Sequence, residues 1–284
     1  MPRDDGAMTA DAAASPGYAT DFLGIGVPLP IATAARAAVE LAYLHFSVTL
    51  DTDRGLAVVT GVNIDGAELL DLPRTGEWHL DERIPASDQT GPAVYAANDL
   101  DRGHLVRRRD PGWGSVAIAR TASEATFVYT NAAPQAADFN QSKELWLGVE
   151  DHVLQYAGAN DLRLSVFSSP VLGADDPEYR GVQLPLRFWK VAAWATGKPG
   201  ELAAAGFVLD QSALIDAATD RARIVPPLGG FRTFQAPIAD IGAIAGVDFG
   251  PLVNADVFAG VVAVTGQRWT ELVEPSQILL ARAS

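Results

Sequence analysis

The stretch that organises this chain is residues 101–110, which read DRGHLVRRRD. It places four arginines and His104 within ten residues of a 284-residue chain whose net charge is -14. These ten residues sum to +2, because the four arginines outweigh Asp101 and Asp110. Positive charge is therefore concentrated at one point, which suits a local phosphate site, whereas a broad basic face for nucleic acid is a poor match.

The composition is that of a globular protein. The chain is 48% hydrophobic and 20% charged, enough to bury the core of one large domain or two small ones. No apolar run approaches the roughly 18 residues of a membrane helix, so no membrane is expected. The absence of cysteine excludes disulfides, iron–sulfur clusters and thiol chemistry. Residues 1–16 lack the basic and apolar segments of a secretory signal, and the localisation stays open.

The segments around this stretch predict an α+β protein. Residues 44–50 (LHFSVTL) and 56–63 (LAVVTGVN) predict a β-hairpin. Further strands are expected at residues 125–130, 163–167, 188–194 and 203–209, a turn at 131–135, and helices from residue 140 to about 158 and at 238–245. We expect a flexible tail at 1–17 and one domain at 18–284, with a central antiparallel or mixed sheet flanked by helices.

Further motifs follow DRGH in a fixed order. They are Thr130–Gln135 (TNAAPQ), Phe139–Gln141 (FNQ), and Trp146 and Glu150 on one predicted helix. This ordered set resembles the DNA/RNA non-specific endonucleases, the sugar-nonspecific ββα-metal nucleases of the endonuclease G type. The family pattern is DRGH, then TNxxPQ, then NQ, then a tryptophan and a glutamate on one helix. The resemblance extends over about residues 17–256 and includes Arg74 with Trp78.

The resemblance implies a ββα-metal finger active site with separate roles for its residues. Neutral His104 would take a proton from water, since an unperturbed imidazole titrates near pH ~6.5. Asn140 would be the only direct protein ligand of Mg²⁺, with Mn²⁺ as a substitute. A neutral amide leaves the charge of the ion available to the scissile phosphate. Arg74 would brace the phosphate in the transition state with its planar guanidinium group.

The resemblance also assigns supporting residues. Arg102 would position the phosphate or the hairpin, and Asn131 would orient parts of the site through hydrogen bonds. Glu150 would hold the water around the metal. The span from Asn140 to the following tryptophan is two residues longer than in some members of the family. On a regular helix Glu144 would then face the metal better, so it is the reserve candidate.

Most of these residues have ordinary explanations when taken alone. DRGH could be a surface turn, Asn131 a turn residue and Asn140 a helix N-cap. Substrate contacts or a solvated charge run would both explain the three consecutive arginines Arg107, Arg108 and Arg109. Only the order and spacing of the whole set favour a catalytic site.

The leading hypothesis is a Mg²⁺-dependent endonuclease that cuts DNA and RNA with little sequence preference and leaves 5′-phosphate ends. One alternative is a catalytically silent module that binds nucleic acid or protein on the same fold. Another is a phosphodiesterase acting on small nucleotides, which the acidic composition would suit better. An inhibitor protein or a homodimer as partner stays open.

Overall fold

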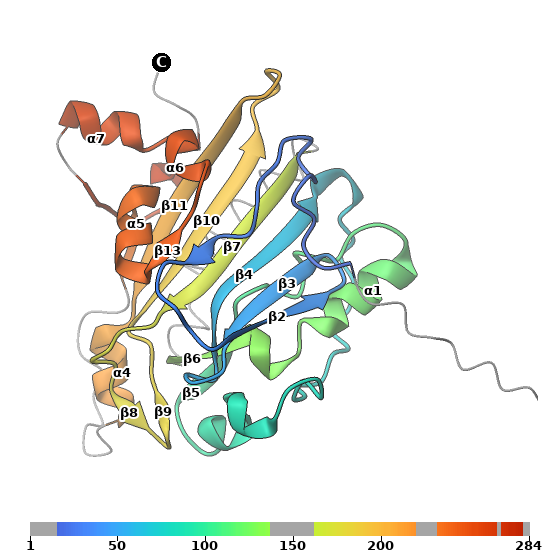
Figure 1. Cartoon of the computed structure of the whole chain (residues 1–284), viewed down its shortest axis with the longest axis vertical. Coiled ribbons are helices and arrows are strands. Elements are labelled where there is room, and N and C mark those ends of the chain that lie inside the picture. The colour runs from blue at the N-terminus through green and yellow to red at the C-terminus, as the bar shows by residue number, and fades with distance from the viewer. Residues whose placement is uncertain (1–15, 137–161, 220–231, 266–267, 281–284) are drawn as a thin grey trace, which may run out of the picture.

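The computed structural model describes residues 16–136, 162–219, 232–265 and 268–280 and is built on an eight-stranded sheet (Figure 1). Every neighbouring pair in this sheet is antiparallel. In spatial order the strands are β14 (Thr270–Leu272), β12 (Arg232–Gln235), β11 (Leu202–Asp210), β10 (Arg187–Ala195), β7 (Arg163–Val171), β4 (Leu56–Asp65), β3 (Phe46–Asp51) and β2 (Ala38–Tyr43). The expected α+β class with a central antiparallel sheet is confirmed.

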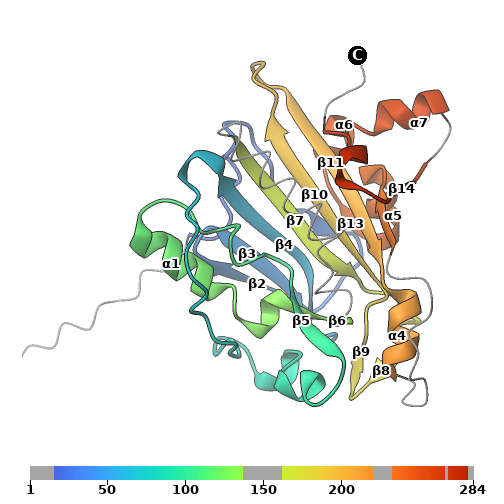
Figure 2. The same cartoon turned by 180° about the vertical axis from the view of Figure 1, so that it is seen from behind.

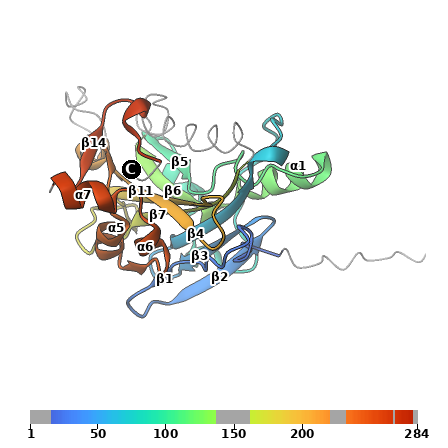
Figure 3. The same ribbon diagram turned by 90° about the horizontal axis from the view of Figure 1, so that it is seen from above.

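Both faces of the sheet are covered, which explains why its central strands are buried at nearly every position. All ten residues of β4 are buried, as expected for a strand packed on both sides. On one face Phe46 belongs to a core that includes Val128, and on the other Trp189 packs in a core with Ile238. Viewed from above, β5 and β6 lie on one side of the sheet and β1 on the other (Figure 3).

The smaller elements complete these two layers. Helices α5 (Ile238–Ala245) and α6 (Leu252–Ala255) belong to the same core as Trp189. Two short strands, β5 (Leu100–His104) and β6 (Ala132–Ala136), form a separate antiparallel pair at one end of the sheet (Figure 2). The other elements are β1 (Ile31–Ala32), β8 (Glu178–Tyr179), β9 (Val182–Gln183), β13 (Val247–Asp248), α1 (Val116–Ala125), α4 (Ser212–Thr219), α7 (Ala259–Thr265), and the 3-10 turns η1 (Gly66–Glu68), η2 (Ala86–Asp88), η3 (Pro92–Tyr95), η4 (Tyr129–Asn131) and η5 (Pro275–Gln277). Within the described ranges, no helix has the length and apolar character needed to cross a membrane.

Most of the secondary structure expected from the sequence is confirmed. The hairpin of residues 44–50 and 56–63 is β3 and β4, and the later strands and the helix at 238–245 are β7, β10, β11 and α5. The expected helix from residue 140 and residues 1–15 of the expected tail lie outside the described residues.

Two expectations for residues 125–135 were wrong. The predicted strand at 125–130 is the end of α1 followed by η4, and the predicted turn at 131–135 lies mostly in β6. Ser115 caps α1 by accepting a hydrogen bond from the Ile118 amide, and the Thr126 hydroxyl closes its end by donating to the Ser123 carbonyl. Pairing with β5 then holds residues 132–136 extended, although alanine and proline do not favour strands.

Candidate active site

The last residue of β5 is His104, and its position is fixed by the β5–β6 pair. The register runs from Leu100 opposite Ala136 to His104 opposite Ala132. A side chain at Gly103 would overlap the buried side-chain amide of Gln135, which would have to move, so glycine favours close approach of the strands here. Close contact between the two strands at this point therefore depends on the third residue of the motif.

Asn131 holds the chain that follows His104. Its main-chain oxygen accepts from the Leu105 amide at 3.0 Å, and its side-chain oxygen accepts from the Val106 amide at 2.9 Å. Its side-chain nitrogen donates to the carbonyls of Val106 at 2.9 Å and of Thr126 at 3.0 Å. Asn131 is fully buried, and these contacts are all with main-chain atoms. They join the end of α1 to the loop after His104.

Two aromatic rings pack against the imidazole of His104. The Trp78 ring lies at 4.6 Å between centroids, tilted by 44°, and the Phe127 ring lies at 4.9 Å, perpendicular to the imidazole. The His104 side chain is partly exposed, but its Nε2 is covered and has no hydrogen-bond partner among the described residues. An orphaned polar atom in such a position is a feature that calls for a functional explanation.

The pKa of His104 is lowered to about 3. Burial is the largest cause, because it disfavours the charged imidazolium, and the positive charges of Arg74, Arg107, Arg108 and Arg102 add to it. The imidazole is therefore neutral at physiological pH and can accept a proton. The expectation of a titration near pH 6.5 holds for an exposed imidazole and not for this one.

Aromatic rings, rather than carboxylates, orient two of these arginines. The guanidinium carbon of Arg74 lies 5.0 Å from the centre of the Phe127 ring, and that of Arg102 lies 5.7 Å from the centre of the Trp78 ring. Neither arginine forms an ion pair with a carboxylate in the part of the chain that the structure describes. Unlike a carboxylate, an aromatic ring holds a guanidinium group without neutralising its charge.

The three consecutive arginines differ in their surroundings. Arg108 is partly buried and donates from Nη1 to the Leu72 carbonyl at 2.6 Å. Burial lowers its pKa, an effect that the carboxylate of Asp71 opposes. Arg109 is exposed, and its Nε lies 3.7 Å from the Asp71 carboxylate. The main-chain amide of Arg107 donates to the Asp110 carboxylate at 3.2 Å. The structure thus places Arg107 and Arg108 near His104 and turns Arg109 toward solvent.

Arg74 and Trp78 lie on residues 74–89, a segment that we call the strap. Two main-chain hydrogen bonds fix its middle to the start of η4 and the residues before it, from the His79 amide to the Phe127 carbonyl and from the Tyr129 amide to the His79 carbonyl. The strap thereby lies beside the residues that lead into β6. Because Trp78 directly precedes His79, these hydrogen bonds place its ring next to His104.

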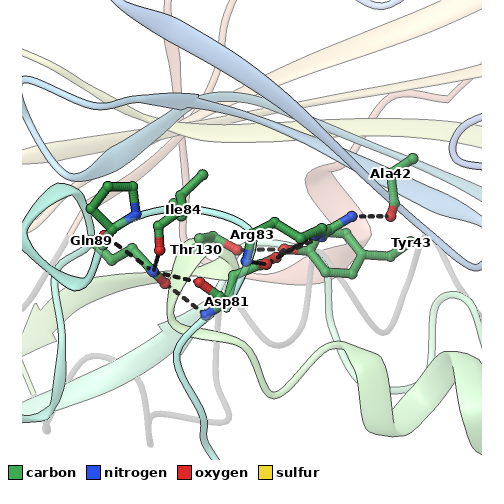
Figure 4. A network of polar contacts seen from close by, with 8 residues as sticks. Ala42, Tyr43, Asp81, Arg83, Ile84, Gln89 and Thr130 are labelled. Carbon is green, nitrogen blue, oxygen red and sulfur yellow. Dashed lines mark hydrogen bonds and ion pairs between the residues drawn. The ribbon is translucent and has the colours of Figure 1, made fainter.

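A buried polar network secures the second half of the strap (Figure 4). The carboxylate of Asp81 accepts from the Tyr43 hydroxyl at 2.5 Å and from two nitrogens of Arg83. The Tyr43 hydroxyl also bonds to the Thr130 hydroxyl at 2.8 Å, and Gln89 bonds to both main-chain groups of Asp81. Burial opposes ionisation of Asp81, but the hydrogen bonds from Arg83 and Tyr43 lower its pKa to about 2. One tyrosine of β2 thus joins the strap to the residue that precedes Asn131.

The expected metal ligand and the two glutamates beside it belong to residues 137–161. Asn140, Glu144 and Glu150 all lie outside the described residues. Within the described ranges, no group of three or more histidine, aspartate or glutamate residues is arranged to hold a metal ion. Sequence reasoning missed the contact of Trp78 and Phe127 with His104. The spacing of Arg74 and Trp78 within the resemblance was the only signal for it.

Comparison with known proteins now identifies the family. The family described as DNA/RNA non-specific endonuclease matches residues 31–256. The chain belongs to the DNA/RNA non-specific endonuclease family. The matched residues include the whole β5–β6 pair, the strap and the consecutive arginines Arg107, Arg108 and Arg109. The resemblance inferred from DRGH and the motifs after it is confirmed.

Two similar proteins extend this family assignment. A protein of Sinorhizobium fredii (strain NBRC 101917 / NGR234), named "Uncharacterized protein y4fB", is 38% identical over 271 residues. The match covers 86% of this chain but 40% of that protein, so the chain spans about two fifths of the length of this relative. The crystal structure of the EndoG/EndoGI complex matches with a TM-score of 0.59 at 16% identity, over 82% of this chain and 91% of that chain. The second likeness is one of fold alone.

Proposed function

We propose that this chain is a metal-dependent endonuclease that hydrolyses phosphodiester bonds in DNA and RNA with little sequence preference, leaving 5′-phosphate ends. The observation that carries this proposal is a neutral imidazole whose covered Nε2 has no partner among the described residues and which the charges of four arginines reach. Hydrolysis of a phosphodiester needs a base that can accept a proton from water and cations that stabilise the charge of the phosphate. Both requirements are met at the end of β5.

Each side chain has a proposed role that follows from its position. His104 takes the proton from the attacking water. Arg74, held over the Phe127 ring with no ion-pair partner in the described ranges, stabilises the charge that develops on the phosphate. Arg102 positions the same phosphate, since it lies two residues before His104 on β5. Asn131 keeps the loop after His104 in place and does not itself touch substrate.

The consecutive arginines Arg107, Arg108 and Arg109 would bind phosphates that flank the scissile bond. The positive charges of Arg107 and Arg108 act at the position of His104, because they help to lower the pKa of its imidazole. Arg109 is exposed and close to Asp71, so we assign it an outer contact that competes with this carboxylate. Substrate binding would therefore depend on Arg107 and Arg108 more than on Arg109.

Mg²⁺, with Mn²⁺ as a substitute, is the proposed cofactor. Its proposed ligand is Asn140, with Glu150, or Glu144 in its place, orienting water nearby; these assignments rest on the sequence motifs. A divalent ion bound there would supply positive charge to the leaving oxygen.

The acidic composition supports a second candidate function, hydrolysis of small nucleotide diesters. A net charge of -14 opposes the approach of a long polyanion, but it opposes a single diester much less. EndoG, whose fold is similar, is inhibited in its complex with EndoGI. A protein inhibitor is accordingly a proposed partner, and assembly into a homodimer is a second possibility for the chain.

Cleavage assays on three substrates test these proposals. Supercoiled plasmid, structureless RNA and bis(p-nitrophenyl) phosphate are incubated with Mg²⁺ and the full chain. We expect cleavage of both polymers, with a loss of at least ~100-fold in His104→Ala. His79→Ala is the matched control, since its ring is exposed and its main-chain anchors remain. The expected products carry 5′-phosphate ends.

The other outcomes separate the alternatives. Turnover of the small diester alone would favour the nucleotide phosphodiesterase. Tight binding of the polymers without turnover at saturating Mg²⁺ would favour the silent binding module. Full activity in excess EDTA would reject the metal. Equal activity of His104→Ala and the unmodified protein would reject the imidazole as the base.

A further inference from the structure

The indole ring of Trp78 contacts two side chains of the proposed site. It contacts the imidazole of His104 at 4.6 Å between centroids, and the guanidinium carbon of Arg102 lies 5.7 Å from its centre. His104 and Arg102 are two residues apart on β5, so their side chains leave the same face of a strand. One ring from the strap therefore contacts both side chains.

The surroundings of Trp78 argue against a role as a platform for a nucleic-acid base. Besides His104 and Arg102, the rings of Phe127 and Tyr129 lie within 5.5 and 5.7 Å of it. The side chain is only partly exposed. A stacking platform needs a free face, as in proteins that bind single strands. The neighbours of Trp78 are instead other parts of the site.

The strap holds Trp78 firmly enough for it to act on its neighbours. The two main-chain hydrogen bonds of His79, the adjacent residue, tie this part of the strap to Phe127 and Tyr129. Three residues after Trp78, Asp81 is tied to Tyr43, whose hydroxyl also bonds to Thr130 (Figure 4). The same hydroxyl thus links the strap to the segment that carries Asn131, and Asn131 holds the loop after His104. The indole and the imidazole are set relative to each other from two sides.

We propose that Trp78 is a positioning residue: its ring fixes the plane of the His104 imidazole and sets the distance between that imidazole and Arg102. The tilted Trp78 ring and the perpendicular Phe127 ring together restrict rotation of the imidazole about its last side-chain bond. The indole also keeps water away from the imidazole. This inference rests on the proposed function, because it concerns the orientation of the base in that reaction.

Substitution of Trp78 tests the inference through kinetics. In Trp78→Leu we expect kcat on a short DNA duplex to fall about 100-fold, since a misplacement of about 1 Å has that cost, with KM changed by less than about threefold. Trp78→Phe keeps an aromatic ring on His104 and should recover kcat to within about tenfold of the unmodified chain. Trp78→Met, which is apolar and flexible, serves if the leucine variant does not fold.

A titration provides a second readout that does not require activity. With ¹³C-labelled histidine, the His104 resonance of the unmodified chain should show no protonation between pH 8 and 5. In Trp78→Leu its midpoint should rise into that range, because water reaches the imidazole. The charged groups around it, Arg74, Arg102, Arg107 and Arg108, are the same in both proteins. The difference in the His104 midpoint between the two proteins therefore measures the effect of the indole.

Trp113 provides a matched control in the same chain. It stacks on His45 at 3.6 Å between centroids and within 8° of parallel, and neither ring belongs to the proposed machinery. Trp113→Leu should move the titration of His45 and leave both kcat and the titration of His104 unchanged. If Trp113→Leu lowers kcat as much as Trp78→Leu does, the effect is general and the inference is overturned.

Two further results would overturn the inference, and one would separate it from the proposed function. A rise in KM with unchanged kcat in Trp78→Leu would mean that Trp78 contacts substrate instead. An unmoved His104 titration would mean that the indole does not shield or orient the imidazole. If the unmodified chain cuts no phosphodiester while the titration still moves, the proposed function fails and the contact between the rings stands.

Discussion

The lowered pKa of His104 predicts how the free energy of unfolding depends on pH. In the folded chain this imidazole stays neutral down to about pH 3, whereas in the unfolded chain it takes up a proton near pH ~6.5. Below about pH 6.5 the unfolded state therefore binds one proton more than the folded state, and acid favours unfolding. The contribution is fully present above that pH and is lost progressively as the pH falls toward 3.

The size of the effect follows from the unfolded-state pKa. At pH 5.5, one unit below 6.5, protonation of this histidine lowers the free energy of unfolding by about 1.4 kcal/mol, while at pH 7.5 its contribution is close to zero. His104→Asn removes the titrating group. From pH 7.5 to 5.5 its free energy of unfolding should therefore fall by about 1.4 kcal/mol less than that of the unmodified chain. His45, whose pKa is also lowered by burial, contributes equally to both proteins and cancels.

Urea unfolding at pH 7.5 and 5.5, followed by circular dichroism, measures this difference. The comparison uses the change with pH in each protein, so a constant loss of stability in His104→Asn does not affect it. His79→Asn, which alters an exposed imidazole, should retain the pH dependence of the unmodified chain. Equal pH dependence in His104→Asn and the unmodified chain would refute the reasoning, because His104 would then titrate alike in both states.

Three further predictions concern the β5–β6 pair, the polar network and the substrate. Gly103→Ala should lower the free energy of unfolding by about 1–3 kcal/mol through overlap with Gln135, while alanine at exposed Gly26, with open space around it, should be close to neutral in the same urea assay. Tyr43→Phe removes a hydroxyl with two partners and should cost about 1–2 kcal/mol, whereas Tyr95→Phe, whose hydroxyl has no partner among the described residues, should cost less. If three arginines bind phosphates, KM for DNA should rise roughly 20- to 40-fold between 50 and 200 mM salt, and a constant KM would contradict this.

The order of motifs was sufficient to predict the family, and β-rich runs were sufficient to predict the main sheet. The error at residues 125–130 shows where pattern reasoning fails. Phe127, Val128 and Tyr129 favour strands in isolation, but here Phe127 packs against His104 and Arg74. Their apolar character serves packing around the site and not a ladder of strands. Tertiary contacts, which a local pattern does not contain, decided the conformation.

The properties of the site depend on contacts distant in the sequence. Arg74 and His104 are 30 positions apart, and the strap brings them together through hydrogen bonds to η4 and β2. The sequence justified a neutral imidazole only from its ordinary pKa of about 6.5. The value of about 3 requires burial and the surrounding arginines, both of which follow from folding. The role of Trp78 was beyond sequence reasoning for the same reason.

The way in which Arg74 and Arg102 are held also bears on how the base would work. An ion pair with a carboxylate would orient an arginine but cancel its charge, whereas a ring orients it and leaves the charge in place. In a chain of net charge -14 this keeps a positive field at the end of β5. Together with burial, which has the larger effect, that field holds His104 neutral before substrate arrives. A bound phosphate would offset part of the field, so we expect the imidazole to become a stronger base when the diester is beside it.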